Sequence, residues 1–469
     1  MNKTVNMSYA LIYRQFSLTA ECIQSFAKNV YFNLQKEKVR RMERIRAVAE
    51  CVVDELRKRG VAHAECYCEE KINNEVVFNG DMLSMFRTNT KDILCLKAVD
   101  SIGRVGKVKT TRLDQTSIAD VLEHTIEIMR DSEEYIWEGV SEGPLYSNSV
   151  SGILVPQKEE LLNSANQLIT DTIISEGKAE LTDCEFIHTL RKRTYLNSND
   201  VCFHQMVGYY SISRNGNVRI NKLNQNIYDL SKPDLILDKN LLGIEPVQLD
   251  KEFRGTLLLS PKAVQNFWWR FRREIFNDDI LDTMGTDPPP IKWYNMFGKK
   301  VADSQLTLEQ RPRDPRFIGA ETFTEDGYLN KNFTIIDKGE FQQYPLSGRM
   351  ARRLGKKQNT GPHIAGASAV FNFVIKPGKT SIEDMIKSIN QGILMLDFRE
   401  TPAAFTGEII APISFGVLIE NGKLIKTVRC IMETNVYEIM YNIRNISKET
   451  VNNGIDEMPW MAFDGVSYK

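Results

Sequence analysis

Apolar residues recur at helical spacing directly after residue 41. The positions are Ile45, Val48, Ala49, Val52, Val53 and Leu56. They fall every three or four residues, so they predict a helix with one buried face, and Gly60 provides a stop signal. Strand patterns follow in "AHAECYCEE", "NEVVFN", "LCLKAVD" and "IGRVGKVKT". The pattern therefore predicts a helix and then a meander of strands.

The next stretch repeats this plan. Apolar spacing predicts helices over 117–131 and 156–177. Strands are expected over "CEFIHTLRKRTYLNSND", "VCFHQMVGYYSISRNGN" and "VRINKLNQNIYDLS", with turns at Asn199-Asp200 and Asn215-Gly216. Strict alternation of strand and helix is absent, so the pattern favours an α+β fold with an antiparallel sheet.

A second domain is expected from about residue 243. It opens with "GTLLLSPKAVQNFWWRFRREIF", which predicts a strand that turns at Ser260-Pro261 and continues as a helix. Helices are also expected over "SIEDMIKSINQGILML" and "NVYEIMYNI", and hairpin turns at Lys338-Gly339 and Asn421-Gly422. We thus expect an N-terminal extension (1–41, disordered or loosely helical), an α+β domain (42–242) and a mostly antiparallel β domain with packed helices (243–469).

Composition narrows the class of protein. The 469 residues are 42% hydrophobic and 26% charged, and the formal net charge is -1. A near-neutral balance gives no general reason to expect nucleic acid or a membrane surface as partner. No apolar run approaches the ~20 residues that span a bilayer, and no secretory signal is recognisable. We therefore expect a cytoplasmic protein whose eight cysteines are reduced.

Few residues have the spacing of a metal site. Cys66 and Cys68 would share one face of a strand, and we interpret them as core thiols. Cys202 and His204 could share a face in the same way, but a closed zinc site needs four ligands. The five histidines include no pair at helical ligand spacing, and standard catalytic motifs are absent.

Two further segments offer candidate ligand-binding residues. The small-residue loop "NTGPHIAGASAVFNF" carries His363, Gly366 and Ser368, and such loops let backbone amides approach a ligand. A surface loop is an equally good interpretation. The segment "SGRMARRLGKK" carries Arg349 and Arg352. Because no aromatic stacking platform accompanies it, we favour a solvated helix face or an inter-domain salt-bridge site over a nucleic-acid patch.

Several spaced motifs resemble the TldD/PmbA family over residues 42–460. They are "DGxxxxxxxxIxxGxxxxYxxxxxxARxLG", a "PG" before a helix, an "IENG" hairpin followed by a helix, and the opening "AxxVxxxLRxRGxxHAExY". The resemblance implies a cytosolic two-domain α+β protein. In this family, linked at first to DNA gyrase, a TldD-type member carries zinc on H-E-x-x-x-H plus a C-terminal Cys. It pairs with a PmbA-type (TldE) member that lacks these ligands, and the complex cleaves unfolded peptides.

The resemblance sets a test for individual residues. Aligning the strands without gaps puts Trp269, Arg270 and Glu274 where the zinc motif would stand, and no Cys follows Cys430. This implies a PmbA/TldE-type subunit with no cofactor of its own, no catalytic residue and no metal ligand. Its partner would be a zinc-bearing TldD-like paralogue or a second copy, and its substrate an unfolded peptide. The peptide-binding candidates are His363, Gly366, Ser368, Arg349 and Arg352.

Two alternatives remain open. One is an autonomous non-zinc peptidase that uses other residues, with His363 beside an acid as the candidate. The other is a homodimeric peptide-binding or regulatory protein, similar to a DNA gyrase modulator.

Overall fold

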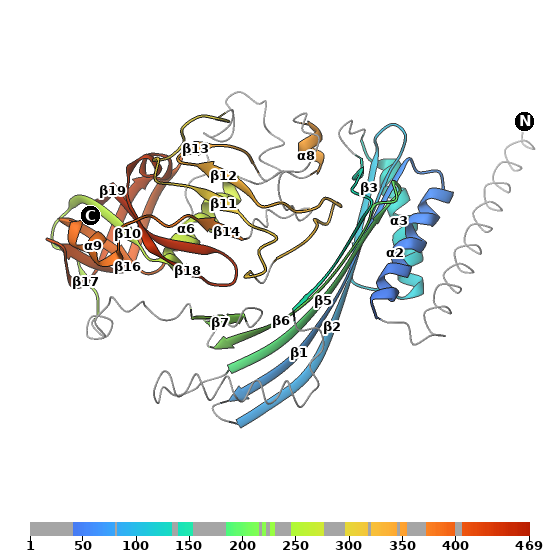
Figure 1. Cartoon of the computed structure of the whole chain (residues 1–469), viewed down its shortest axis with the longest axis horizontal. Helices are drawn as coiled ribbons and strands as arrows, with labels where there is room; N and C mark the ends of the chain where they lie inside the picture. The colour runs from blue at the N-terminus through green and yellow to red at the C-terminus, as the bar shows by residue number, and fades with distance from the viewer. Residues whose placement is uncertain are drawn as a thin grey trace, which may run out of the picture.

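Two large sheets carry most of the chain in the computed structural model (Figure 1). The structure describes residues 41–79, 82–133, 139–152, 184–214, 218–221, 226–229, 245–275, 296–317, 320–344, 348–353, 372–398 and 406–469. The extension expected over 1–41, apart from Arg41, lies outside these ranges, as do the helix expected over 156–177 and the expected domain boundary at 242–243.

The N-terminal sheet has six strands in the order β3-β2-β1-β5-β6-β4. Its neighbours are antiparallel except for β4 and β6, which are parallel. In Figure 1 the long strands β1, β2, β5 and β6 run together as a curved ribbon. The strands are β1 (His63–Asn79), β2 (Met82–Val99), β3 (Val105–Thr110), β4 (Tyr146–Gly152), β5 (Cys184–Asn197) and β6 (Cys202–Arg214). A separate two-stranded sheet joins β7 (Val218–Asn221) to β8 (Asn226–Asp229).

Helices α2 (Arg41–Lys58) and α3 (Gln115–Asp131) cover one end of the N-terminal sheet on a single face (Figure 1). The apolar stripe predicted for the first helix is fully buried there, together with Cys66 and Cys68 of β1. Asp114 begins α3 by accepting a hydrogen bond from the Ser117 backbone N–H at 3.0 Å, a typical N-cap. The helix-plus-sheet prediction is confirmed for this part of the chain.

The C-terminal sheet has eleven strands in the order β13-β12-β11-β14-β19-β10-β15-β16-β17-β9, with β18 paired to β19. Most of its neighbours are antiparallel, as expected for an α+β domain. The strands are β9 (Val247–Gln248), β10 (Phe253–Leu259), β11 (Leu308–Gln310), β12 (Phe333–Asp337), β13 (Glu340–Phe341), β14 (Phe373–Ile375), β15 (Gln391–Met395), β16 (Glu408–Glu420), β17 (Lys423–Asn435), β18 (Ile443–Asn452) and β19 (Glu457–Tyr468).

Among the described residues, five helical elements accompany this sheet. They are α6 (Pro261–Ile275), α8 (Gly348–Arg353), α9 (Ile382–Ser388), α10 (Val436–Ile439) and the 3-10 turn η2 (Met440–Asn442). Helix α6 packs against β19, and its buried side chains belong to the largest apolar core of the molecule. Helix α9 packs in a second core with Leu258, Leu394 and Trp460. Both cores include side chains of β10, the strand that leads into α6. Packing on both faces therefore fixes the position of β10.

The helix expected over 381–396 is only half right. Helix α9 ends at Ser388, and Gln391–Met395 is the strand β15, paired in parallel with β10. A short apolar run such as "GILML" does not distinguish a buried strand from a helix. The choice depends on the neighbouring β10, because Gly392 lies so close to it that a Cβ would stand 2.4 Å from the Thr256 carbonyl oxygen.

The two predicted hairpin turns are confirmed. Lys338 and Gly339 both have positive φ, 48° and 82°, and Asn421 and Gly422 have 48° and 73°. Two consecutive left-handed residues define the turn type that matches the twist of paired strands. Among the helices of the described ranges, none has the length and hydropathy of a membrane-spanning segment.

Candidate functional site

Helix α6 carries Trp269, Arg270 and Glu274, the positions that align with the zinc motif of TldD-type relatives. Its entry is fixed by Ser260, whose side-chain oxygen accepts the Ala263 backbone N–H at 3.2 Å and donates to the Leu396 carbonyl at 2.8 Å. Ala263, Val264, Phe267 and Trp268 are fully buried. Val264, Phe267 and Trp268 recur at helical spacing in the sequence, and that spacing predicts this buried face.

Arg272 lies one helical turn after Trp268 on α6 and is also buried. Its guanidinium donates to both carboxylate oxygens of Asp456, with Nη1–Oδ1 and Nη2–Oδ2 distances of 3.2 Å. Arg272 is 1% exposed and Asp456 is 0% exposed. The guanidinium also lies 4.7 Å from the centroid of the Trp269 ring and 4.6 Å from that of Phe373. A planar guanidinium held in this way forms a bidentate pair between two aromatic rings.

The Asp456 carboxylate is saturated by its neighbours. Besides Arg272, it accepts hydrogen bonds from the Phe373 backbone N–H at 2.9 Å and from Gln265 Nε2 at 3.2 Å. Asp456 lies in the connection between β18 and β19, directly before β19, so its pair with Arg272 joins α6 to the last hairpin. These contacts hold the segments together. The lone pairs of the Asp456 carboxylate are occupied by N–H donors, so this carboxylate has none left for another ligand.

The structure tests only part of the predicted residue set. Trp269 is half-buried against Arg272. Arg270 and Glu274 lie within α6, and Arg349 lies within α8, but their side chains fall outside the described set. His363, Gly366 and Ser368 belong to 354–371, which the structure does not describe. Of the peptide-binding candidates, only Arg352 has a described side chain.

Arg352 bridges the two domains from α8. It donates to the Tyr328 hydroxyl at 2.8 Å and to the Gly139 carbonyl at 3.3 Å. Lys97 of β2 donates to the same Gly139 carbonyl at 2.9 Å. Arg352 therefore connects the two parts of the chain through a hydroxyl and a carbonyl, whereas the salt bridge and the peptide contact considered for this segment stay predictions.

Residues 320–330, which we call the docking loop, connect β11 to β12 and lie against the N-terminal sheet. The Phe323 ring packs on Phe203 with centroids 5.5 Å apart. Gly327 has a φ of 79°, and a Cβ there would stand 2.1 Å from the Tyr195 ring. Only a residue without a side chain fits this contact. The docking loop thus seats on the face of the sheet opposite α2 and α3.

A network of buried charges surrounds the docking loop. Arg191 Nη2 contacts Glu69 at 2.9 Å, and Arg191 Nη1 contacts Glu321 of the docking loop at 3.3 Å. Arg193 Nη1 also contacts Glu321 at 3.3 Å, and Arg193 Nε donates to the Tyr67 hydroxyl at 2.8 Å. Burial tends to raise the pKa of Glu69, but Arg191 and then Arg193 outweigh it and bring the pKa to about 2.

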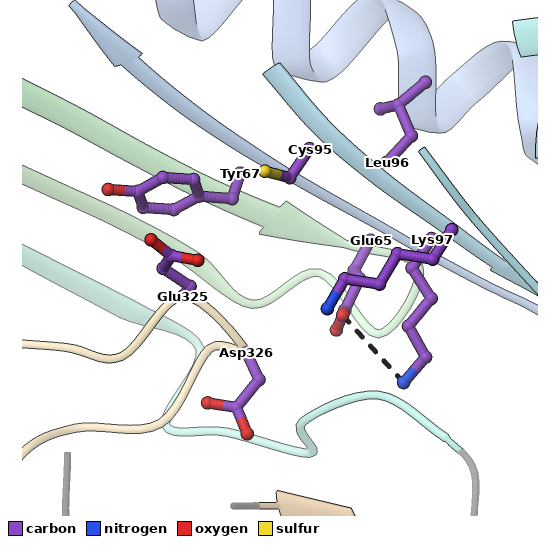
Figure 2. Close-up of a pocket in the computed structure, with 8 residues that line it drawn as sticks. Glu65, Tyr67, Cys95, Leu96, Lys97, Glu325 and Asp326 are labelled. Carbon is purple, nitrogen blue, oxygen red and sulfur yellow. Dashed lines mark ion pairs between the residues drawn. The ribbon is translucent and has the colours of Figure 1, made fainter. Parts of the chain in front are cut away.

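A small pocket opens beside this network between β1, β2 and the docking loop (Figure 2). Glu65 lies at its inner end, accepts the Tyr195 hydroxyl at 2.9 Å and pairs with Lys97 at 3.9 Å. Figure 2 shows the Glu325 carboxylate beside Tyr67. Within the described ranges, no residue donates a hydrogen bond to it. Burial raises the pKa of both Glu65 and Glu325. Burial at this pocket therefore favours the protonated form of both carboxyl groups.

The sequence interpretation missed this charged face. Its signal was available, because Glu65 and Glu69 in β1 and Arg191 and Arg193 in β5 stand at alternating positions. Alternating positions of a strand share a face. Charges repeated at that spacing predict a polar sheet face, although they do not reveal which segment covers it.

The two cysteine pairs behave differently. Cys66 and Cys68 are fully buried with their sulfurs 3.6 Å apart, as expected of core thiols. Cys202 is only partly buried, and its Sγ lies 3.2 Å from His204 Nε2. Burial raises the pKa of Cys202, and burial together with Arg46 lowers the pKa of His204 to about 4. The pair is therefore a neutral thiol and imidazole rather than an activated thiolate. Across the described residues, no group of three or more His, Cys, Asp or Glu is arranged to hold a metal ion.

Comparisons with known proteins agree with these features of the C-terminal domain. Residues 254–469 match the family described as "PmbA/TldA metallopeptidase C-terminal domain". The chain is 23% identical over 240 residues to the metalloprotease PmbA homolog of Buchnera aphidicola, covering 50% of this chain and 49% of the relative. The chain thus spans about half the length of this curated relative.

Solved structures extend the likeness in fold to most of the chain. The TldE structure from Thermococcus kodakarensis superposes with a TM-score of 0.66 and 17% identity, covering 89% of this chain and 99% of that one. A protein from Bacteroides thetaiotaomicron, described as a proposed modulator of DNA gyrase, gives a TM-score of 0.72 and 19% identity, covering 91% and 99%. At these identities the likeness shows a shared fold.

Proposed function

The chain belongs to the PmbA/TldD family of metallopeptidase-like proteins, and we propose that it acts as a non-catalytic, PmbA/TldE-like subunit. In this role it pairs with a zinc-bearing TldD-like paralogue in the cytoplasm. The paralogue supplies the chemistry, and this chain helps to enclose and present an unfolded peptide.

The pair of Arg272 and Asp456 carries this proposal. Zinc is held by Cys, His and carboxylate ligands, and a catalytic site keeps three protein ligands and one open position. Here α6 instead holds the buried Arg272 guanidinium, which has donors and no acceptor. It forms a buried fork with the carboxylate that comes from the C-terminal hairpin. Trp269, at the first motif position, stacks on that guanidinium. These residues do not fit a zinc ion, so no catalytic step is assigned to this face.

The remaining contacts support a scaffolding role. The docking loop is fixed to the N-terminal sheet by Arg191, Arg193 and the close contact at Gly327. Arg352 and Lys97 add a second connection through the Gly139 carbonyl. Two domains held in one orientation by buried polar contacts are suited to form part of the wall of a shared cavity.

The direct test combines this chain with its zinc-bearing paralogue. Native mass spectrometry would report the complex, and an unstructured peptide would report cleavage. We expect no cleavage by this chain alone, a one-to-one complex, and cleavage by the complex that a chelator abolishes.

A matched control uses the paralogue with both motif histidines changed to alanine. The complex should still form, and cleavage should be lost. Cleavage by this chain alone would favour an autonomous peptidase. Self-association without any complex with the paralogue would favour a homodimeric regulatory protein. Either result would contradict the proposal.

A further inference from the structure

A row of three cations crosses the N-terminal sheet. Strand register places Lys71 of β1 directly opposite Lys91 of β2 on one side and Arg191 of β5 on the other. Side chains paired in this way lie on the same face of a sheet. Lys71 shares its face with Tyr67, which packs beside Phe323 of the docking loop. The row therefore lies on the face opposite α2 and α3, on the side of the C-terminal domain (Figure 1).

Two of the three charges are not neutralised. Arg191 contacts Glu69 at 2.9 Å and Glu321 at 3.3 Å. Among the described residues, neither the Lys71 nor the Lys91 ammonium has an ion-pair or hydrogen-bond partner. Burial, then Arg191 and Lys91, lower the pKa of Lys71, and Glu69 opposes this only in part. Because like charges that face each other destabilise a sheet, the two lysines are positioned at a cost to stability.

The next row of the sheet adds a neutral donor. Thr189 Oγ1 donates to Asn73 Oδ1 at 3.0 Å, which leaves the amide nitrogen of Asn73 available. That nitrogen has no acceptor within the described ranges. Asn73 follows Lys71 by two positions, so it lies on the same face about 7 Å further along the strand. Two ammonium groups and an amide thus form a group of donors without acceptors.

Carboxylates flank this donor group along β1. Glu69 precedes Lys71 by two positions on the same face, and Glu75 follows it by four. Both carboxylates are buried and already paired, Glu69 with Arg191 and Glu75 with Arg87. A chain of phosphates that ran along the strand would meet both acids within about 20 Å. The donor group therefore fits one small anionic group and not a polyanion.

From this geometry we propose that Lys71, Lys91 and Asn73 bind a carboxylate of the enclosed peptide, either an acidic side chain or a free C-terminus. An ionised carboxylate accepts several hydrogen bonds and donates none, so it complements these three donors and neutralises the two facing lysines. The inference rests on the proposed function, which supplies the peptide, and it adds the class of peptide that binds best.

Peptide binding to the full chain tests this site without the paralogue. Fluorescence anisotropy would compare three labelled Gly/Ser-rich peptides: an amidated peptide with one central Glu, the same peptide with Gln in its place, and the Gln peptide with a free C-terminal carboxylate. At least one carboxylate peptide should bind about 10-fold more tightly than the amidated Gln peptide. The peptide that shows this gain identifies the source of the carboxylate, and added salt should reduce the gain.

Variants locate the gain on the sheet. Lys71→Gln/Lys91→Gln should remove it, whereas Lys71→Arg should keep it because the charge remains. Lys379→Gln/Lys423→Gln, which removes two exposed lysines of the C-terminal domain, should leave it unchanged. Thermal unfolding should show Lys71→Gln/Lys91→Gln to be at least as stable as the parent chain, because like-charge repulsion is relieved. Loss of binding would then not be due to unfolding.

Three results would overturn the proposal: equal binding of all three peptides, binding of none, or a gain that persists in Lys71→Gln/Lys91→Gln. Native mass spectrometry separates these results from the partner role. The double variant should still form a one-to-one complex with the paralogue. Failure of the parent chain to form that complex would contradict the proposed function, while a carboxylate preference measured on the chain alone would stand.

Discussion

Arginine is buried in two regions of this molecule, and the two burials have opposite character. On α6, Arg272 meets a single carboxylate in a closed fork inside the C-terminal domain. Between the domains, Arg191 and Arg193 share Glu69, Glu321 and the Tyr67 hydroxyl, and a pocket opens next to them. The first region is fully satisfied. The second leaves Glu325 without a hydrogen-bond donor among the residues that the structure describes.

The two regions differ in how they should respond to the loss of one charged side chain. A closed ion pair such as Arg272–Asp456 has its hydrogen-bonding groups occupied, so it stabilises one arrangement of its two segments. A shared network at a domain boundary responds to changes in any of its members, because each charge has more than one partner. We therefore expect perturbation of α6 to affect global stability, and perturbation of the docking loop to affect how the domains stay together. Four substitutions test this contrast.

The largest effect is expected at Asp456. Asp456→Leu leaves a buried guanidinium without its partner, and breaking such pairs costs about 3–5 kcal/mol. Urea unfolding of the full chain would measure the loss. The double variant Arg272→Met/Asp456→Leu should recover part of it, because no charge is then left buried. Glu50→Gln, in the exposed ion pair with Arg46, should cost less than about 1 kcal/mol. Equal costs for Asp456→Leu and Glu50→Gln would show that the fork is not structural.

Gly327→Ala should destabilise docking of the loop by about 2–4 kcal/mol. The new Cβ would overlap the Tyr195 ring, and overpacking and left-handed strain each cost about 1–3 kcal/mol. Gly60→Ala is a matched control, since Gly60 has the same φ of 79° but nothing within 4 Å of the added Cβ. Limited proteolysis of the docking loop would compare them. If Gly327→Ala and Gly60→Ala are cleaved at the same rate, the contact between Gly327 and Tyr195 does not hold the docking loop on the N-terminal sheet.

Arg193→Met should lower the free energy of unfolding by about 2 kcal/mol, which is typical for loss of hydrogen bonds to a charged group. The effect is smaller than at α6 because Glu321 keeps Arg191 as a partner. Hydrogen–deuterium exchange should increase in the docking loop and remain unchanged in α6. Arg57→Met, in an exposed ion pair with Asp200, serves as the comparison. Faster exchange in α6 would mean that the two regions are not separable.

The smallest effect is expected from Glu325→Gln, and it should depend on pH. Burial raises the pKa of Glu325 above its ordinary 4.5, with Glu321 and Glu69 adding to the rise and Arg193 and Lys109 opposing it. The folded chain therefore holds this proton to higher pH than the unfolded chain does, and stability falls as pH rises from 4.5 through the folded pKa. Glutamine cannot ionise, so the variant should escape that loss.

Thermal unfolding across pH would measure this difference. Parent and variant should agree below pH 4.5, where the Glu325 carboxyl is protonated in both folded and unfolded chains, and the variant should be more stable above it. Glu438→Gln, at an exposed position of α10, controls for removal of one negative charge. A constant offset at every pH would be inconsistent with a buried ionising carboxyl.

Prediction from the sequence succeeded where the pattern is local. The buried stripe of the first helix, the stripe of α6 with Val264, Phe267 and Trp268, and the left-handed turns at Lys338-Gly339 and Asn421-Gly422 all follow from residue type and spacing. It failed at Gln391–Met395, where five residues fit either a helix or a strand. There the neighbouring β10 decided the outcome, and no window of nearby residues contains that information.

The sequence by itself determined the α+β class, the sharp turns and the absence of H-E-x-x-x-H from α6, because each depends on which residues stand at fixed local spacing. Only the tertiary structure decided which partner the buried Arg272 of α6 has. Arg272 and Asp456 are 184 residues apart, and Arg191 and Glu321 are 130 apart. Periodicity indicates which face a charged residue occupies, but its partner is chosen by how distant segments pack. Since a buried charge is tolerated only with that partner, the closed fork and the open inter-domain network are both products of the fold.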